Sequence, residues 1–377
     1  MPFEHYIRSG KKQLRCGYTT GTCAALAAGA AARLLLTGQS PKTARLRTPK
    51  GLWVEVPIAE AVFDRGEARC GVKKDAGDDV DVTDGLLIVA AVRKKETPGV
   101  AITGGVGVGV VTKPGLDQPV GAKAINRVPR QMIAQAVQEV CDQWEYDGGI
   151  QVTVSVPQGR EAAVKTFNPA LGIEGGISIL GTSGVVEPMS EQAIVDTIAV
   201  EIRQRRAQGA ERLLLTPGNY GMAFLKRSGV LPEETPLVKC SNFIGEAMDI
   251  AATEHFHTVL LVGHVGKLVK LAGGLFNTHS KWGDCRTELF CAHAGAQGAS
   301  KALCRSLLQA ATADACLELL DKEHLRKPVL DSLLEAMQRQ MTKRADGAFS
   351  TGAVLFSNGY GYLGETSAVA GIKRSWV

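Results

Sequence analysis

The sequence has few aromatic side chains and no long apolar run, and both shortages limit what the chain can be. Aromatic residues make up 5% of its 377 residues. We find no run of about 18 apolar residues and therefore expect no membrane span. The N-terminus lacks the apolar core of a signal peptide. No block of Lys and Arg alternates with aromatics, so nucleic acid is disfavoured as a partner despite the net charge of +5.

The cysteine pattern excludes further classes of protein. Nine cysteines are scattered along the chain, an odd number, and no C-x-x-C pair occurs. This argues against a disulfide framework and against a zinc ribbon. The simplest compartment for such a chain is a reducing cytoplasm, and we expect a cytoplasmic protein.

Glycine, in contrast, is abundant, with 43 residues. Residues 23–36 are rich in alanine and leucine and predict a helix that Thr20 or Thr22 caps and Gly38 ends. The preceding turn brings threonine hydroxyls to a helix N-terminus. Two interpretations stay open there: a capped structural helix, or a site for an anion or carboxylate.

The rest of the first half is predicted to be mixed α+β. Its candidate strands are 44–48, 52–58, 68–72, 86–92 and 151–157, and a helix is expected over 131–144. The loop 73–84 has five aspartates but no EF-hand spacing, so we favour a solvated or active-site loop over a metal site. The glycine-rich loop 104–116 is not a P-loop, although its Lys113 could bind a carboxylate.

From residue 173 the pattern changes to alternating strands and helices, which is typical of a parallel sheet with crossover helices. The predicted strands are 177–180, 212–216, 237–240 and 258–263, with helices over 190–208 and between 288 and 338. Ligands bind at the carboxyl ends of such strands. The loops expected there are 181–184, 217–221, 241–242 and 263–267.

The C-terminal segment 352–364 predicts a hairpin centred on Asn358-Gly359. We expect it to return to the β-rich first half. The predicted fold class is therefore an α+β N-terminal domain intertwined with an α/β Rossmann-like parallel-sheet domain. The first domain would comprise 1–165 plus 345–377 and the second 173–340.

Several segments together resemble one family, the cobalt-precorrin-5B (C1)-methyltransferases of anaerobic cobalamin biosynthesis. They are CGYTTGTCAA at 16–25, KDAGDD at 74–79, GVVTKPGL at 109–116, INRVPR at 125–130, ISILGTSGVVEPMS at 177–190, PGNYG at 217–221, GHVGKLVKLA at 263–272 and NTHS at 277–280. Thr83-Asp84 and Arg127 depart from the family pattern, so no catalytic histidine is assigned in the first domain.

The resemblance implies methyl transfer from S-adenosylmethionine to C-1 of a cobalt-bearing, carboxylate-rich corrinoid, giving cobalt-precorrin-6A. Cobalt would arrive within the substrate, and no metal site is assigned to the protein. The expected donor-binding residues are Gly181, Thr182, Ser183, Gly184, Glu187, Gly218, Asn219, Gly221 and Gly263. The expected acceptor-binding residues are Thr19, Thr20, Thr22, Lys73, Lys113, Arg130 and Lys267. The candidates for proton removal are His264, His279 and Asp284.

Two other functions stay open at this point. One is a nucleotide-dependent oxidoreductase acting on a corrinoid, and the other is a corrinoid-binding protein without catalysis. The expected partner is a small-molecule corrinoid, with neither nucleic acid nor membrane, and the sequence leaves a homo-oligomer open.

Overall fold

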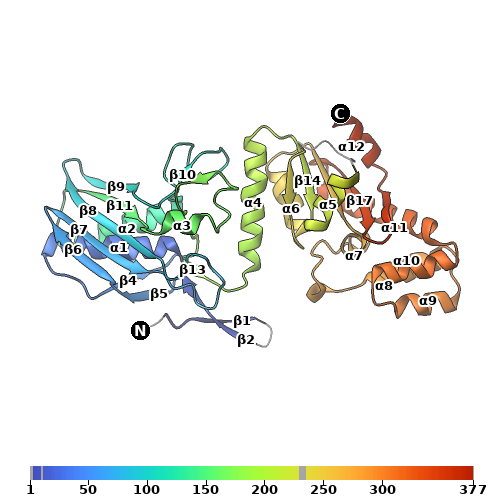
Figure 1. The fold of residues 1–377 in the computed structure, drawn as a ribbon, viewed down its shortest axis with the longest axis horizontal. Helices are drawn as coiled ribbons and strands as arrows, with labels where there is room; N and C mark the ends of the chain where they lie inside the picture. The colour runs from blue at the N-terminus through green and yellow to red at the C-terminus, as the bar shows by residue number, and fades with distance from the viewer. Residues whose placement is uncertain (1–2, 10–11, 229–234, 377) are drawn as a thin grey trace. The chain divides into compact units, whose positions relative to one another are not determined.

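The protein divides into two compact units, Met1–Glu191 and Gln192–Val377. The structure is a computed structural model that describes residues 3–9, 12–228 and 235–376 (Figure 1). Each unit has its own hydrophobic core.

The first unit is built on a five-stranded sheet. The strand order is β6 (Glu60–Asp64), β7 (Glu67–Lys73), β8 (Leu87–Lys95), β11 (Gly149–Ser155) and β9 (Gly99–Gly104). Every neighbouring pair is antiparallel except β11 and β9. The short pairs of this unit are β1 (Tyr6–Ser9) with β2 (Lys12–Arg15), β3 (Gly17–Tyr18) with β13 (Val185–Val186), β4 (Thr43–Arg47) with β5 (Trp53–Pro57), and β10 (Val110–Val111) with β12 (Ile173–Glu174).

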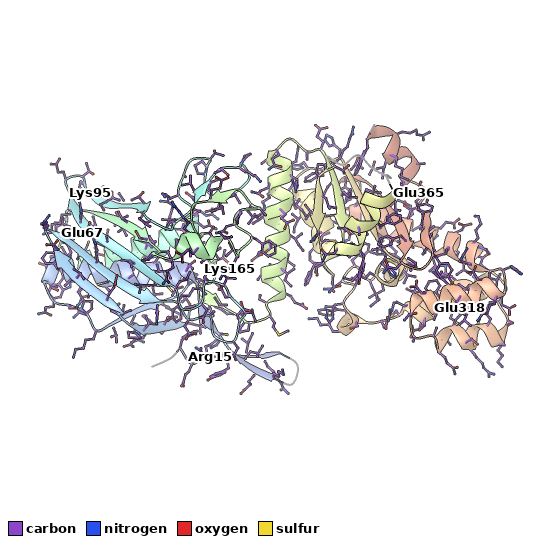
Figure 2. All side chains as sticks on the ribbon, in the orientation of Figure 1. Arg15, Glu67, Lys95, Lys165, Glu318 and Glu365 are labelled. Atoms are coloured by element: carbon purple, nitrogen blue, oxygen red, sulfur yellow. The ribbon has the colours of Figure 1, made fainter. Side chains whose placement is uncertain are left out.

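Two helices cover one face of this sheet. Helix α1 (Thr20–Thr37) packs on α2 (Arg127–Gln143), and its small side chains bring the two backbones close together. A Cβ on Gly29 would lie 3.4 Å from the carbonyl oxygen of Ala136. Because strand residues alternate between faces, the other face carries charges such as Glu67, which accepts from Arg69 and Arg93 (Figure 2). The short helix α3 (Gly159–Ala163) completes the unit.

Helix α1 is long and apolar enough to cross a membrane by length and composition, so the expectation that no such segment exists was too strong. However, 72% of that stretch is buried inside the protein. Burial of this kind is what a core helix shows, and packing against α2 and the sheet accounts for its composition.

The second unit contains the predicted parallel sheet. Its order is β15 (Leu237–Lys239), β14 (Arg212–Thr216), β16 (Thr258–His264), β17 (Ser350–Ser357) and β18 (Gly361–Glu365). All neighbours are parallel except the β17–β18 hairpin at the edge. The direction of strand succession reverses between β14 and β16, which makes their carboxyl ends the topological switch point.

Helices cover both faces of this second sheet. On one face lie α5 (Asn219–Ser228) and α12 (Val369–Ser375). The hydrophobic cluster on the other face includes residues of α4 (Glu191–Ala207), α6 (Ile244–Thr253), α7 (Val265–Leu268), the 3-10 helix η1 (Val269–Gly273) and α11 (Arg326–Ala345). Helices α8 (Arg286–Ala296), α9 (Lys301–Leu308) and α10 (Ala313–Lys322) extend this cluster by packing on α7, η1, α11 and one another. A second 3-10 helix, η2 (Ser280–Trp282), lies in the loop before α8.

Two predictions about architecture were wrong. The hairpin forms, but β17 pairs with β16 from Thr258↔Ser350 to His264↔Phe356, so the C-terminal segment completes the second unit and the domains do not intertwine. The segment 177–180 also belongs elsewhere: Ile177 and Ile179 make isolated bridges to Val108 and Ile125 within the first unit. Hydrophobic periodicity identifies a strand but does not specify its pairing partner.

Candidate functional site

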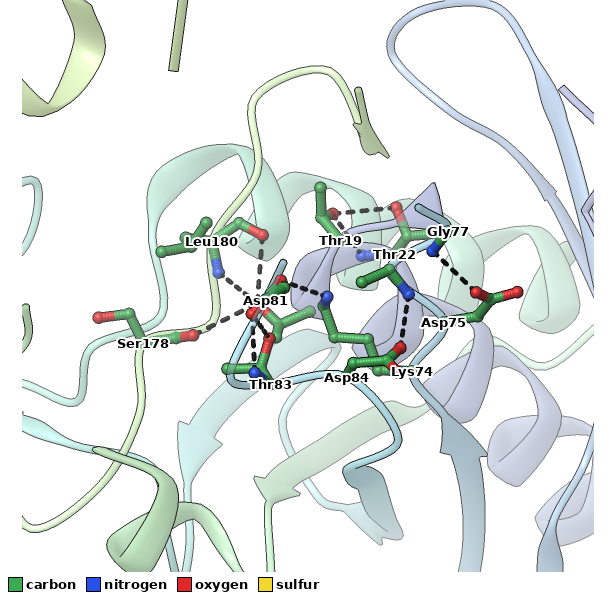
Figure 3. A network of polar contacts seen from close by, with 12 residues as sticks. Thr19, Thr22, Lys74, Asp75, Gly77, Asp81, Thr83, Asp84, Ser178 and Leu180 are labelled. Atoms are coloured by element: carbon green, nitrogen blue, oxygen red, sulfur yellow. Dashed lines mark hydrogen bonds and ion pairs between the residues drawn. The ribbon is translucent and has the colours of Figure 1, made fainter. Parts of the chain in front are cut away.

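In the first unit, the predicted ligand groups at the N-terminus of α1 are buried and already hydrogen-bonded. Thr19, and not Thr20 or Thr22, is the N-cap, and its hydroxyl accepts from the Thr22 amide at 3.2 Å. The Thr20 hydroxyl accepts from Leu180 N at 2.9 Å, and that of Thr22 donates to the Gly184 carbonyl at 2.7 Å. Segment 178–184 therefore covers this helix end (Figure 3), and the threonines act structurally.

The two glycines of this segment are explained by close packing. Gly181 has φ +124°, and a Cβ there would lie 2.4 Å from the Thr19 side chain. Gly184 has φ +78°, and its Cβ would lie 2.8 Å from Cβ of Thr48. Since the loop belongs to the first unit, it does not follow a strand of the parallel sheet, and that reason for assigning it to the donor is lost.

The neighbours of these glycines differ in accessibility. The Ser183 hydroxyl donates to Val185 O at 2.9 Å, and Glu187 forms an ion pair with Lys50. Thr182 is exposed and lines an open hollow of about 510 Å³. The hollow is also lined by Arg47, Thr48, Pro49, Gly51, Val128, Gln131, Met132 and Gln135.

Ion pairs occupy much of the aspartate-rich loop. Lys74, which is 4% exposed, bonds Asp81 at 2.6 Å (Figure 3). Arg15 holds Asp75 with two bonds of 2.6 and 2.8 Å. The hydrogen bond from Arg15 lowers the pKa of Asp75. Within residues 3–9, 12–228 and 235–376, no three His, Cys, Asp or Glu side chains gather as metal ligands.

The remaining cations predicted for the acceptor differ in accessibility. Lys73 is exposed at the end of β7, and Lys113, also exposed, donates to Ala170 O at 3.3 Å. Arg130 donates instead to the carbonyls of Ile125 and Ile102 at 2.9 and 3.1 Å. Its guanidinium thus ties the start of α2 to β9, which is a structural role.

In the second unit, the carboxyl ends of β14, β15 and β16 bring polar groups together as predicted. Gly218 follows β14 with nothing within 4 Å of its hypothetical Cβ, and Asn219 is exposed at the start of α5. Gly221 and Gly263 are tightly packed, with Cβ positions 1.9 Å from Thr216 Oγ1 and 2.9 Å from Leu268 Cγ. Of these glycines, Gly218 is the one that faces open space.

A network at this edge includes two residues that were not among the predicted ligand residues, Asn242, whose loop was expected here, and Thr278. Lys267 Nζ donates to Asn242 Oδ1 at 2.9 Å and to Pro217 O at 3.4 Å. The Thr278 hydroxyl donates to the same Asn242 oxygen at 3.2 Å. Burial lowers the pKa of Lys267, and nearby Lys270 lowers it further. The signal for Asn242 was its place directly after a strand, in a loop expected at this edge.

Each of the predicted bases already has a hydrogen-bond partner within the protein. His264 and His279 each cap a helix, with Nδ1 accepting from Gly266 N at 3.0 Å and Lys281 N at 3.1 Å. A neutral ring bonded in this way carries its hydrogen on Nε2 and acts there as a donor. Asp284 accepts from Arg286 Nη2 at 2.7 Å, and this partner lowers the pKa of the carboxyl, which makes it a weaker base.

The chain resembles known proteins over most of its length. The family model CbiD matches residues 7–188, and the model of the CbiD C-terminal domain matches 277–367. A cobalt-precorrin-5B C(1)-methyltransferase of Ruminiclostridium cellulolyticum is 46% identical, covering 94% of this chain and 92% of that one. One of Moorella thermoacetica is 40% identical, with coverages of 97% and 98%. A crystal structure of the cobalamin biosynthesis protein CbiD from Archaeoglobus fulgidus matches at 30% identity and a TM-score of 0.40, covering 74% of this chain and 87% of that one.

Proposed function

The chain belongs to the CbiD family, and on that premise we propose that it methylates cobalt-precorrin-5B at C-1, using S-adenosylmethionine and giving cobalt-precorrin-6A. Its relatives identify it as a C-methyltransferase of cobalamin biosynthesis. The observation that carries the proposal is the high identity to proteins of that name along nearly the whole chain.

We place the donor at the switch point of the second unit. Gly218 leaves this edge open, Asn219 is exposed beside it, and Gly263 lets the end of β16 approach Pro217. Lys267 adds a cationic group at the same edge. S-adenosylmethionine would supply an electrophilic methyl group on a sulfonium. The residues of the edge would accelerate the reaction mainly by orienting the reactants, which is worth several orders of magnitude.

The acceptor carries carboxylates, and of the first-unit cations predicted to bind them Lys73 and Lys113 are exposed to solvent. A lysine ammonium binds carboxylates as a mobile point charge and tolerates variation in their position. Cobalt enters as part of this substrate. Thr182, which lines the open hollow, is the residue of the 181–184 loop that we retain as a ligand contact.

An assay of methyl transfer tests the proposed function directly. The protein, cobalt-precorrin-5B and S-adenosylmethionine with a deuterated methyl group should yield a product heavier by one deuterated methyl group. NMR of the product should place that methyl on C-1. A corrinoid that binds without gaining the label would support the binding-protein alternative. Turnover that requires a nicotinamide cofactor would support the oxidoreductase.

Substitution of Gly218 tests whether the methyl donor binds at this edge. Gly218→Val should keep the melting temperature, because its side chain meets open space, yet weaken S-adenosylhomocysteine binding by roughly 10-fold or more through crowding of the edge. Gly371→Val is the matched control, since it also enters open space but lies on α12. Normal affinity in a folded Gly218→Val variant would move the donor elsewhere.

A further inference from the structure

The ammonium of Lys267 is partly buried with only neutral partners. It donates to a side-chain amide oxygen, Asn242 Oδ1, and to a main-chain carbonyl, Pro217 O. Within the described residues no carboxylate lies in ion-pair distance of its Nζ. Partial burial disfavours the charged amine and lowers its pKa, and an anion beside the ammonium would offset that effect. The ammonium is therefore suited to an anionic ligand.

The side chain of Asn242 is held in one orientation. Lysine has no acceptor, so the atom facing Lys267 must be the amide oxygen, and the Thr278 hydroxyl donates to the same oxygen. The Thr278 backbone amide also donates to Asn242 O at 3.0 Å. In the part of the chain that the structure describes, the Asn242 NH₂ group has no acceptor. It is a second fixed donor beside the ammonium.

The two donors and the Pro217 carbonyl that accepts from Lys267 come from different strand ends, which meet at the switch point. Asn242 follows β15, Lys267 lies beyond β16, and Pro217 follows β14. A Cβ on Gly263 would lie 3.1 Å from Pro217 Cδ, so the ends of β14 and β16 are in contact. Ser241, just before Asn242, has φ +51°, a strained value of the kind that clusters at ligand sites.

We propose that Lys267 and Asn242 bind a carboxylate group of a ligand of the methyl-transfer reaction. The ammonium provides the charge and the amide NH₂ a directed hydrogen bond, while Thr278 positions the amide. Two ligands carry such a group: the amino-acid end of the methyl donor and the acidic side chains of the corrinoid. This inference rests on the proposed function, because it takes its ligands from that reaction.

Binding measurements distinguish the two sources without requiring turnover. Calorimetry would compare S-adenosylhomocysteine, 5′-methylthioadenosine, which lacks the amino-acid end, and cobyrinic acid, a stable carboxylate-rich cobalt corrinoid. In Lys267→Met, the ligand whose carboxylate is bound should lose roughly 10- to 100-fold in affinity, the loss expected for a charge-assisted hydrogen bond. Selective loss for S-adenosylhomocysteine, with 5′-methylthioadenosine unchanged, assigns the donor; selective loss for cobyrinic acid assigns the acceptor.

The Asn242→Asp variant tests the same site with a substitution that should leave the protein folded. The aspartate keeps an acceptor for Lys267 and Thr278 but replaces the NH₂ donor by a negative oxygen, so the melting temperature should hold while carboxylate binding falls. Lys301→Met, an exposed lysine on α9, controls for the change in net charge. The inference is overturned if folded Lys267→Met and Asn242→Asp bind both carboxylate ligands as the wild type does. Failure of methyl transfer by the wild type, in contrast, would count against the proposed function alone.

Discussion

At the residue scale, two histidines of the second unit, His264 and His279, act as helix caps. His264 ends β16, and its Nδ1 accepts from Gly266 N. Its Nε2 lies 3.9 Å from Asp314 Oδ2, and its ring meets Phe356 edge-on. Burial lowers the pKa of His264, against the opposing effect of Asp314. Both ring nitrogens thus face groups of the protein. This favours a structural role for His264, as the cap of α7, over proton removal from the substrate.

Substitution of His264 separates these roles. His264→Ala should cost about 1 kcal/mol of unfolding free energy through loss of the cap, whereas His264→Asn, a better cap, should restore it. Both variants should keep kcat within a few-fold of the wild type. Denaturant unfolding and steady-state kinetics measure the two effects. A folded His264→Asn variant with kcat lowered by about 100-fold or more would restore His264 as a general base.

At the scale of elements, the loop between β7 and β8 is stabilised by ion pairs close to the N-terminus of α1. The Lys74 side chain is almost fully buried, and Asp81 is its partner. Burial alone would raise the pKa of Asp81, but Lys74 and the hydrogen bonds from Thr83 outweigh it and lower the pKa. The five aspartates are thus largely explained by charge pairing and backbone bonding.

This ion pair predicts a pH dependence of stability. Because the folded pKa of Asp81 lies below its unfolded value of about 3.9, its contribution is complete above that value and is lost as the pH falls through the folded pKa. Asp81→Asn should cost about 3 kcal/mol near pH 7, since it leaves a buried lysine charge unpaired. The difference from the wild type should shrink below about pH 4.

Urea unfolding from about pH 7 to about pH 3 would measure this difference. Asp147→Asn, in an exposed loop, is the control and should match the wild type at each pH. A pH-independent difference between Asp81→Asn and the wild type would show that packing, and not charge, accounts for the loss.

At the scale of the whole molecule, the C-terminal hairpin determines whether the second unit is complete. Strand β17 lies between β16 and β18, and residues on its two faces belong to both hydrophobic clusters of this unit. The core of the first unit contains none of the hairpin residues. Loss of the hairpin should therefore affect only the unit whose sheet it completes.

Deletion of residues 346–377 tests whether the hairpin stabilises the second unit alone. In the truncated chain, β14 and β16 should lose their protection against amide hydrogen exchange. The reason is that β16 loses its partner strand β17, and both faces of the sheet lose packed side chains. Helix α1 and strands β7 and β8 should stay as protected as in the full chain. Increased exchange in the first unit, with the second unit unchanged, would instead support the intertwined arrangement.

Sequence alone determined features that depend on neighbouring residues. Strand 212–216 forms with the predicted bounds, Gly38 ends α1 with φ +69°, and the hairpin turns at Asn358-Gly359. Alternation, capping and turn chemistry are local properties, so they can be identified from residues close together in the chain. The family resemblance was likewise carried by short motifs.

Tertiary structure alone decided which of these local features meet. The bond from Leu180 N to Thr20 joins residues 160 apart in sequence, and it changes a predicted ligand site into the covered end of a helix. Pairing of β17 with β16 assigned the hairpin to the second unit, and convergence of Lys267, Asn242 and Thr278 defined a polar site there. Hydrophobic periodicity shows that a segment is buried but not against which partner, because that choice rests on contacts between distant residues.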